Sequence, residues 1–177
     1  LHYDMARLLL ARTPESEQPQ RVFEIVQHLN RGLIHLQEGL RLTAIRLNVA
    51  AGKRTVSSGA ATTAEGYFAV ARRLLREEDW EAQRTLGFEL WLQSADSALL
   101  RRDFEGSLAL LQDLEQRSPS LMESAHIEVR RLNVFVVTKS PEECSRHAVK
   151  VLRRHGVRWP LHPSPLRARL ELRRALW

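Results

Sequence analysis

Apolar side chains recur every three or four residues through residues 80–118, and this spacing constrains the fold more than any other feature of the chain. Within each half of the stretch, these positions share one face of a helix. A polar turn at Arg102-Asp103-Phe104 separates the halves, so the stretch predicts two antiparallel helices. The shared faces consist of Phe88, Trp91, Leu92, Ala95, Ala98 and Leu99 in the first helix, and Phe104, Leu108, Leu111 and Leu114 in the second.

Segments with the same period lie on both sides of this hairpin. A hairpin cannot bury its apolar face alone, so stacked neighbours are expected. The turns before Phe104 and Pro141 lie about 37 residues apart, within the ~34 to ~47 residue period of helix-pair repeats. The sequence therefore predicts an all-α fold, an α-solenoid of antiparallel helix hairpins. The other helices are expected at about 2–11, 20–31, 36–51, 56–76, 121–137, 140–154 and, as a beginning only, 166–177.

Three of these segments carry specific expectations. Gly52 is expected to end the helix over 36–51. The run 134–138 is rich in β-branched residues, which favour a strand, but the helical period continues through it and we predict helix. Ser140 and Pro141 form a good helix start. The predicted inner faces are Val22, Ile25, Val26 and Leu29; Leu36, Leu40, Ala44, Leu47 and Ala51; and Leu121, Ala125, Val129, Leu132 and Val136.

Cysteine content and hydropathy bear on the compartment. Cys144 is the sole cysteine, so an intrachain disulfide is excluded, which fits a reducing cytoplasm. No window approaches the ~18 uninterrupted apolar residues of a membrane-spanning helix. We therefore expect a cytoplasmic protein without a membrane span.

The net charge of +6 is concentrated at one end of the chain. Residues 1–140 contain 18 basic and 18 acidic side chains, whereas residues 141–177 contain nine basic and three acidic ones. An electrostatic partner should therefore dock near the C-terminal end, and an acidic protein surface is preferred. Nucleic acid is the weaker candidate, because only Trp159 and Trp177 could stack on bases. The candidate interaction surface is Arg153, Arg154, Arg158, Arg167, Arg169, Arg173 and Arg174.

The sequence contains no complete motif for nucleotide binding, zinc binding or catalysis. A phosphate-binding loop around Gly52-Lys53 would need glycine and serine or threonine where Leu47 and Arg54 stand. Cys144 and His147 could converge on one helix, but zinc needs about two further ligands. We interpret Cys144 as a small core residue and His147 as a surface one, and the other histidines as scattered surface or capping residues. The sequence thus predicts a non-enzyme that does not bind ATP, with no catalytic, cofactor-binding or metal-binding residue.

Several strings resemble one family. Residues 23–32 (FEIVQHLNRG) resemble the FEIVxHLNRG signature of very large bacterial signalling proteins, and the turn Asp103-Phe104-Glu105 resembles a tetratricopeptide turn. The turn Lys139-Ser140-Pro141 departs from the family's usual glycine–aromatic pair. Further matching strings are LNVAAG at 47–52, Tyr67 with Leu74-Leu75, DFEGSLALL at 103–111 and GVRWPLHPSP at 156–165.

The resemblance implies an organisation. Family members combine a serine/threonine-kinase-like domain, an AAA/STAND-type ATPase, a tetratricopeptide-like helical region, and GAF and sensor histidine-kinase domains. By this resemblance, residues 1–14 are the tail of the ATPase's winged-helix end, 15–157 are tetratricopeptide-like repeats, and 158–177 are a linker and the next helix. The chain itself would be non-catalytic, within a kinase or ATPase parent.

Two functions follow as hypotheses. The first is a helical-repeat module that binds a signalling partner, or neighbouring domains of its own chain, and relays this to the ATPase and kinase. The alternative is a helical effector arm of a STAND-type transcription regulator, with nucleic-acid contact at the basic C-terminal end. A GAF or histidine-kinase region downstream of Trp177 would favour the first, and a helix-turn-helix the second.

Overall fold

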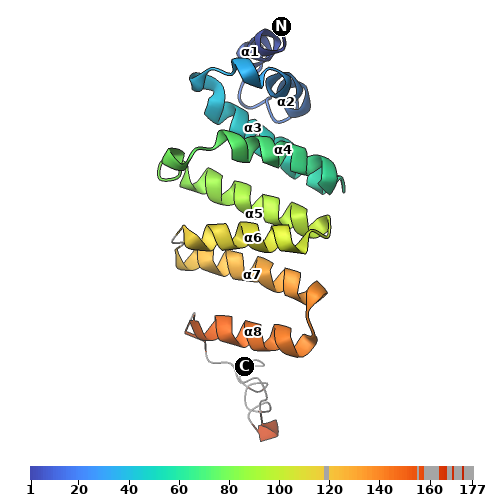
Figure 1. The fold of residues 1–177 in the computed structure, drawn as a ribbon, viewed down its shortest axis with the longest axis vertical. Coiled ribbons are helices and arrows are strands. Elements are labelled where there is room, and N and C mark those ends of the chain that lie inside the picture. The colour runs from blue at the N-terminus through green and yellow to red at the C-terminus, as the bar shows by residue number, and fades with distance from the viewer. Residues whose placement is uncertain (118–119, 155, 158–163, 167–168, 170–172, 174–177) are drawn as a thin grey trace. The chain divides into compact units, whose positions relative to one another are not determined.

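The computed structural model describes residues 1–117, 120–154, 156–157, 164–166, 169 and 173 (Figure 1). Every regular element among these residues is a helix, which confirms the all-α class predicted from periodicity. The chain divides into two compact units, residues 1–118 and 119–177. None of the described helices is long and apolar enough to cross a membrane.

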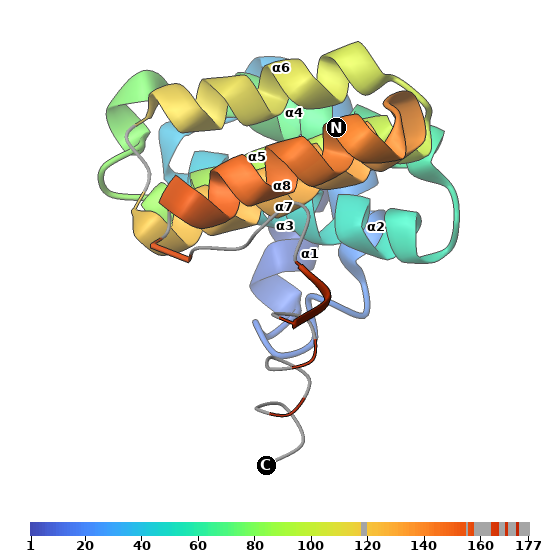
Figure 2. The ribbon, with the colours of Figure 1, turned by 90° about the horizontal axis from the view of Figure 1, so that it is seen from below.

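In the first unit, each helix packs against the next helix along the chain (Figures 1 and 2). Most connections are short, so neighbouring helices in sequence are also neighbours in space. The elements are α1 (His2–Arg12), α2 (Val22–Arg31), the 3₁₀ turn η1 (Leu33–His35), α3 (Glu38–Ser57), α4 (Ala61–Leu74), the 3₁₀ turn η2 (Glu77–Asp79), α5 (Arg84–Leu100) and α6 (Phe104–Gln116).

The inner face predicted for α2 is confirmed, because its four apolar residues are fully buried against α1 and α3. At the edge of this cluster, Asn30 and Asn48 exchange two amide hydrogen bonds of 2.8 and 3.0 Å. Asn48 is fully buried and also donates to the carbonyl of Ala44. Its amide is thus satisfied inside the core, where an unpaired polar group would be costly.

Gly52 does not end a helix, contrary to the sequence expectation. α3 continues through it to Ser57, and the turn falls at Gly59, whose φ of +82° is a conformation that favours glycine. The helix expected over 56–76 consequently begins only at Ala61. Gly52 has a packing role instead: a Cβ there would lie 2.7 Å from Cζ of the fully buried Phe68. The missing side chain lets α3 and α4 approach closely.

We therefore expect Gly52→Ala to destabilise the protein. Alanine favours a helix interior by about 1 kcal/mol over glycine, but overpacking a core costs about 1–3 kcal/mol, and Phe68 has no solvent to move into. Gly66→Ala in α4 is the matched control, since its Cβ would meet nothing within 4 Å. Urea unfolding should show a lower midpoint for Gly52→Ala and an equal or higher one for Gly66→Ala. A gain in both variants would contradict the packing role.

The hairpin of α5 and α6 forms as predicted, but α5 is buried over a wider arc. Leu90, Ser94 and Ser97 are buried beside the expected face, whereas Phe88 and Leu99 are only partly buried. The physical reason is that α5 packs against α4 as well as α6. Ser97 accordingly donates to the carbonyl of Ala61 at 3.1 Å, and Ser107 of α6 donates to that of Ala95 at 2.9 Å.

The second unit contains α7 (Leu121–Thr138) and α8 (Pro141–Arg154), which pack together. Reciprocal capping boxes begin both helices: Ser120 with Glu123, and Ser140 with Glu143. Residues 134–138 are helical, as predicted.

The predicted inner face of α7 is wrong. Leu121, Val129 and Val136 are 71%, 56% and 68% exposed, and Ala125 and Leu132 are partly buried. The buried residues are instead Ile127, Glu128 and Val134. Apolar residues with helical spacing lie on two sides of α7. Packing buries the narrower side, which contains Ile127 and Val134, and leaves the wider one exposed.

The predicted linker and last helix lie mostly outside the described residues. Of that region, Pro165, Leu166, Arg169 and Arg173 are helical and exposed. The division into 1–14, 15–157 and 158–177 stays a prediction.

Candidate binding surface of the α7–α8 pair

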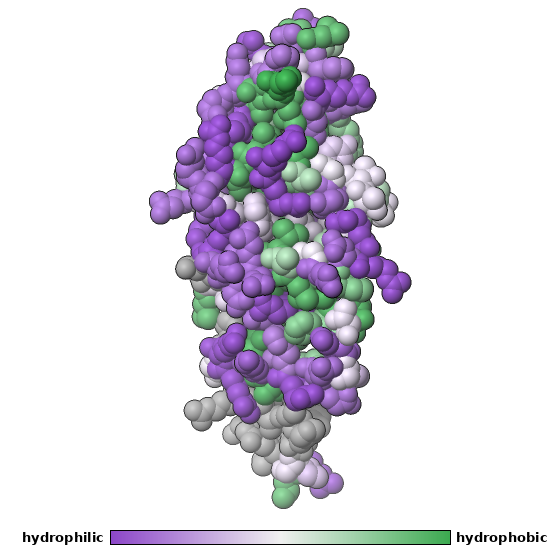
Figure 3. Space-filling model, in the orientation of Figure 1, coloured by the Kyte–Doolittle hydropathy of each residue, from purple (hydrophilic) through white to green (hydrophobic). Residues whose placement is uncertain are grey.

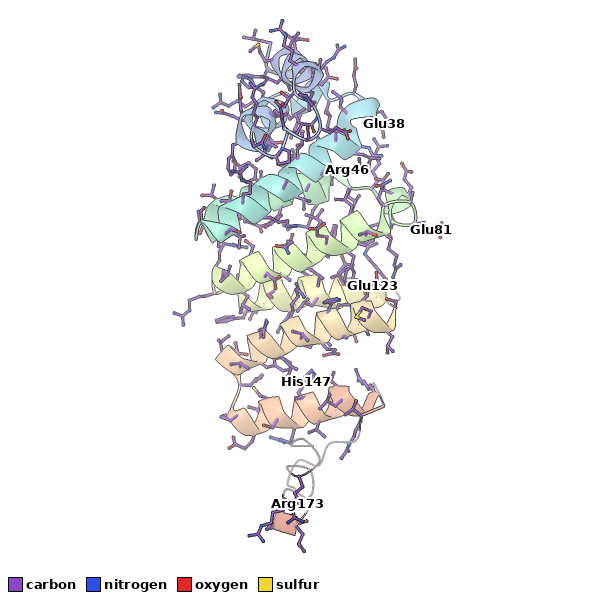
Figure 4. The ribbon with its side chains drawn as sticks, turned by 180° about the vertical axis from the view of Figure 1, so that it is seen from behind. Glu38, Arg46, Glu81, Glu123, His147 and Arg173 are labelled. Atoms are coloured by element: carbon purple, nitrogen blue, oxygen red, sulfur yellow. The ribbon has the colours of Figure 1, made fainter. Side chains whose placement is uncertain are left out.

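The carboxylate of Glu128 organises the contact between α7 and α8. Its side chain is 6% exposed, and one oxygen accepts a 3.1 Å hydrogen bond from Nη1 of Arg131. The other oxygen lies 3.1 Å from Nε2 of His147, which Figure 4 shows on α8 beside α7. Nη1 of Arg154 lies 3.7 Å from the same carboxylate. A buried charge needs such partners, so Glu128 determines which side of α7 faces α8.

His147 is also held by an aromatic contact. The rings of His147 and Phe135 meet edge to face: their centroids lie 4.8 Å apart and their planes are inclined at 77°. His147 is therefore partly buried and held by two contacts, whereas the sequence interpretation made it a plain surface residue. Cys144, three positions earlier, is partly buried and free.

A groove of about 310 Å³ lies between α7 and α8, and the contact of Phe135 with His147 forms part of its wall. A second hollow, of about 480 Å³, continues along α8. The groove is lined by Phe135, Lys139, Glu143, Arg146, His147 and Lys150, and the hollow by Arg146, Val149, Lys150, Arg153 and Arg154.

Positive charge dominates the groove because three cations, Lys139, Arg146 and Lys150, line it together with one carboxylate, that of Glu143. Glu128 is buried among cations, and Glu123 and Glu143 accept backbone hydrogen bonds at their helix starts. The hydrogen bonds from Ser140 lower the pKa of Glu143, so it stays ionised at its cap. Lys139, Lys150 and Arg153 form no ion pair within the described part of the chain, which leaves their charges available to a ligand.

The structure describes four of the seven arginines that the sequence predicted as an interaction surface. Arg153 and Arg154 lie exposed in the last turn of α8 and line the hollow. Arg169 and Arg173 are exposed, and Arg158, Arg167 and Arg174 lie outside the described residues. Sequence reasoning missed five groove residues: Phe135, Lys139, Arg146, His147 and Lys150. The spacing of Arg146, Lys150 and Arg153 along one helix was the available signal.

The other candidate sites occupy ordinary helical positions. Lys53 lies inside α3, and its Nζ pairs with Oε1 of Glu89 at 2.5 Å. The segment is therefore helix and not a phosphate-binding loop, although the absence of ATP binding stays a prediction. Two of the histidines interpreted as scattered meet each other: Nδ1 of His2 lies 3.0 Å from Nδ1 of His28. No group of three or more metal-ligating side chains forms within the described ranges.

Removing the charge of Glu128 should loosen the second unit. Glu128→Gln keeps the shape but leaves Arg131 and His147 facing a neutral amide, which we expect to cost about 1–3 kcal/mol. Glu142→Gln, at an exposed position on α8, is the control. Hydrogen exchange of the α8 amides should accelerate in Glu128→Gln alone. Equal protection in both variants would mean that Glu128 does not hold the pair together.

Comparison with known proteins gives one weak similarity. No family model matches the chain, and no solved structure matches it. The chain is 25% identical over 146 residues to the hybrid signal transduction histidine kinase G of Dictyostelium discoideum. The match covers 77% of this chain but only 4% of that protein. The chain thus spans a very small share of its relative's length.

Proposed function

We propose that this chain is a non-catalytic helical-repeat module that binds protein and regulates a larger ATPase/kinase signalling protein. The observation that carries the proposal is the packing of each helix in the first unit on the next one along the chain. Helical repeats are built this way, and they use their exposed faces to bind partners. A tetratricopeptide-like, solenoid arrangement of hairpins is part of the proposal.

Two further observations support this function. The α7–α8 pair offers a cationic groove whose lysines have no ion pair among the described residues, as a surface for an acidic partner would. The relative in Dictyostelium is named as a signal transduction histidine kinase, and the chain resembles a small part of it. A match to only 4% of that protein's length is what a small regulatory module inside a long signalling protein would give.

The test uses the segments that the same gene encodes on either side of this chain. Each segment is expressed separately and titrated against the 177-residue chain by calorimetry. We expect at least one to bind with micromolar affinity, and the affinity should fall as salt rises. Addition of the chain should also change that segment's ATPase or kinase rate. Absence of any such binding, or ATP hydrolysis by the chain alone, would contradict the proposal.

A second candidate function is favoured by the net positive charge of residues 119–177, which contain 12 basic and five acidic side chains. This is the effector arm of a STAND-type transcription regulator, with nucleic acid at the basic end. Phosphate contacts release counterions, so such binding should weaken steeply with salt. Sub-micromolar affinity for duplex DNA at physiological salt, lost when Arg169 and Arg173 are changed to Glu, would make this candidate the better one.

A further inference from the structure

The apolar arc that packing leaves uncovered on α7 borders the cationic groove. We define the α7 stripe as Met122, Val129, Leu132 and Val136. Met122, Val129 and Val136 are 69%, 56% and 68% exposed, and they repeat every seven residues along one line of the helix. The stripe runs for about 21 Å at 1.5 Å per residue, or about four helical turns.

The stripe and the groove lie on one side of the α7–α8 pair. Residues advance by about 100° around a helix, so Leu132, Val136 and Val129 follow Phe135 in one rotational direction within about 120°. Phe135 and Lys139 line the groove. The α7 wall of the groove therefore passes directly into the stripe. Figure 3 shows one face of the chain, on which green apolar patches lie among purple polar residues.

This juxtaposition indicates the chemistry of the occupant. Exposed valine and methionine in a continuous row are typical of an interaction site, and three cations, Lys139, Arg146 and Lys150, line the adjoining groove. We propose that the α7 stripe and the groove together dock an acidic amphipathic helix. Its apolar face covers the stripe, and its carboxylates meet the three cations. The inference deepens the proposed function by naming the kind of partner, and it rests on that function.

Two other occupants fit less well. A second copy would bring together two surfaces with the same charge, since residues 119–177 hold 12 basic and five acidic side chains. Nucleic acid would satisfy the cations but not the stripe, because phosphates and sugars offer no apolar cover and stacking needs exposed aromatic rings. Phe135, the aromatic residue of the groove, already contacts His147.

The probe is a synthetic peptide of about 18 residues, with leucines at helical spacing and glutamates elsewhere. One control peptide has the same composition in a scrambled order, and another carries lysine in place of glutamate. Binding to the full 177-residue chain is measured by fluorescence anisotropy at low and physiological salt. We expect the amphipathic acidic peptide to bind at least about ten-fold more tightly than either control.

Two variants of the chain locate the site. Val129→Glu/Val136→Glu places charges on the stripe, and Lys139→Glu/Arg146→Glu/Lys150→Glu reverses the cations. Each should weaken binding by about ten-fold or more. Their matched controls change exposed residues of the first unit: Ile34→Glu/Leu100→Glu for the apolar pair, and Arg12→Glu/Arg31→Glu/Arg73→Glu for the cations. The controls should bind as the unaltered chain does.

Four results would overturn the inference. Equal binding of the scrambled peptide would show that charge alone acts. A fall in thermal midpoint for Val129→Glu/Val136→Glu, absent from Ile34→Glu/Leu100→Glu, would show that the chain itself covers the stripe. Self-association abolished by the stripe variant would assign the stripe to a second copy. Tighter binding to DNA, insensitive to the stripe variant, would assign the cations to nucleic acid.

The two proposals can fail separately. If the flanking segments bind the chain but the stripe and cation variants leave that binding unchanged, the inference is wrong and the proposed function stands. If no flanking segment binds, the proposed function is wrong regardless of the peptide result.

Discussion

Asp79→Ala will lower the free energy of unfolding by about 3–5 kcal/mol, the usual cost of breaking a buried ion pair. Arg41 of α3 donates to both oxygens of Asp79, from Nη1 at 2.5 Å and from Nη2 at 2.9 Å. The two side chains are only 10% and 11% exposed. Without Asp79, the guanidinium keeps Glu38, whose side chain is 60% exposed, and the carbonyl of Leu74. These contacts place the expected loss near the lower limit.

Glu78→Ala is the control for Asp79→Ala, because Glu78 is 73% exposed and pairs at the surface with Arg76. It should change stability by less than about 1 kcal/mol. Both variants are measured by urea unfolding followed by circular dichroism. Equal midpoints for the two variants would mean that the Arg41–Asp79 pair contributes no more than a surface pair.

The same pair predicts a pH dependence. Hydrogen bonds from Arg41 lower the pKa of Asp79 from 3.8 to about 2, despite the opposing effect of burial. A carboxyl with a lowered pKa in the folded state stabilises the fold fully above its unfolded pKa, and this stabilisation is lost as pH falls toward the folded pKa. Between pH 4 and pH 2, stability should therefore fall less steeply in Asp79→Ala than in the unaltered chain. Parallel pH profiles would contradict this role of Asp79.

Trp91→Ala should cost about 3–5 kcal/mol, as expected for truncating a large core side chain. Trp91 is 9% exposed, and its Nε1 donates to Oδ2 of Asp113 at 2.5 Å. Its ring meets that of Trp80 at a centroid distance of 5.0 Å, near an edge-on geometry. The guanidinium of Arg117 lies 3.9 Å from the Trp80 centroid. Removal of Trp91 thus opens a cavity and releases the segment that carries Trp80.

Leu100→Ala is the control for Trp91→Ala, because Leu100 lies in the same helix but is 60% exposed. This substitution should change stability by less than about 0.5 kcal/mol. Trp91→Phe should lie between the two, because it keeps an aromatic ring but loses the donor to Asp113. Thermal midpoints followed by circular dichroism check the order. A midpoint unchanged in Trp91→Ala would place the side chain outside the core.

Local signals predicted the helices and most of their starts, but not the start of α4 at Ala61. Ser140 and Pro141 predicted the start of α8, and the spacing of Val22, Ile25, Val26 and Leu29 predicted the buried face of α2. These features depend on residues within one or two turns of each other. The role of Gly52 was not predictable in the same way, because the atom that excludes a Cβ there belongs to Phe68 on the next helix.

Periodicity is ambiguous where a helix carries two apolar arcs or packs on two sides. α7 offers Ile127 and Val134 on one arc and Val129 and Val136 on another, and both arcs satisfy helical spacing. Ser94 and Ser97 of α5 are polar yet buried, because partners on the neighbouring helix satisfy their hydroxyl groups. Arg72 donates a hydrogen bond to Ser94, and Ser97 donates one to the carbonyl of Ala61. Such choices depend on partners more than twenty residues away, which a local pattern does not contain.

Capping, periodicity and charge are properties of residues close together in the chain. The amino-acid pattern therefore predicted the all-helical class, most of the helix starts and the excess of positive charge near the C-terminal end. The packing of the helices in three dimensions settled which arc of α7 is covered. It also brought Phe135 and Lys139 of α7 together with Arg146, His147 and Lys150 of α8. The cause is the buried carboxylate of Glu128: its partners come from α8, as His147 and Arg154, as well as from α7, as Arg131, and these contacts turn the α7 stripe outward.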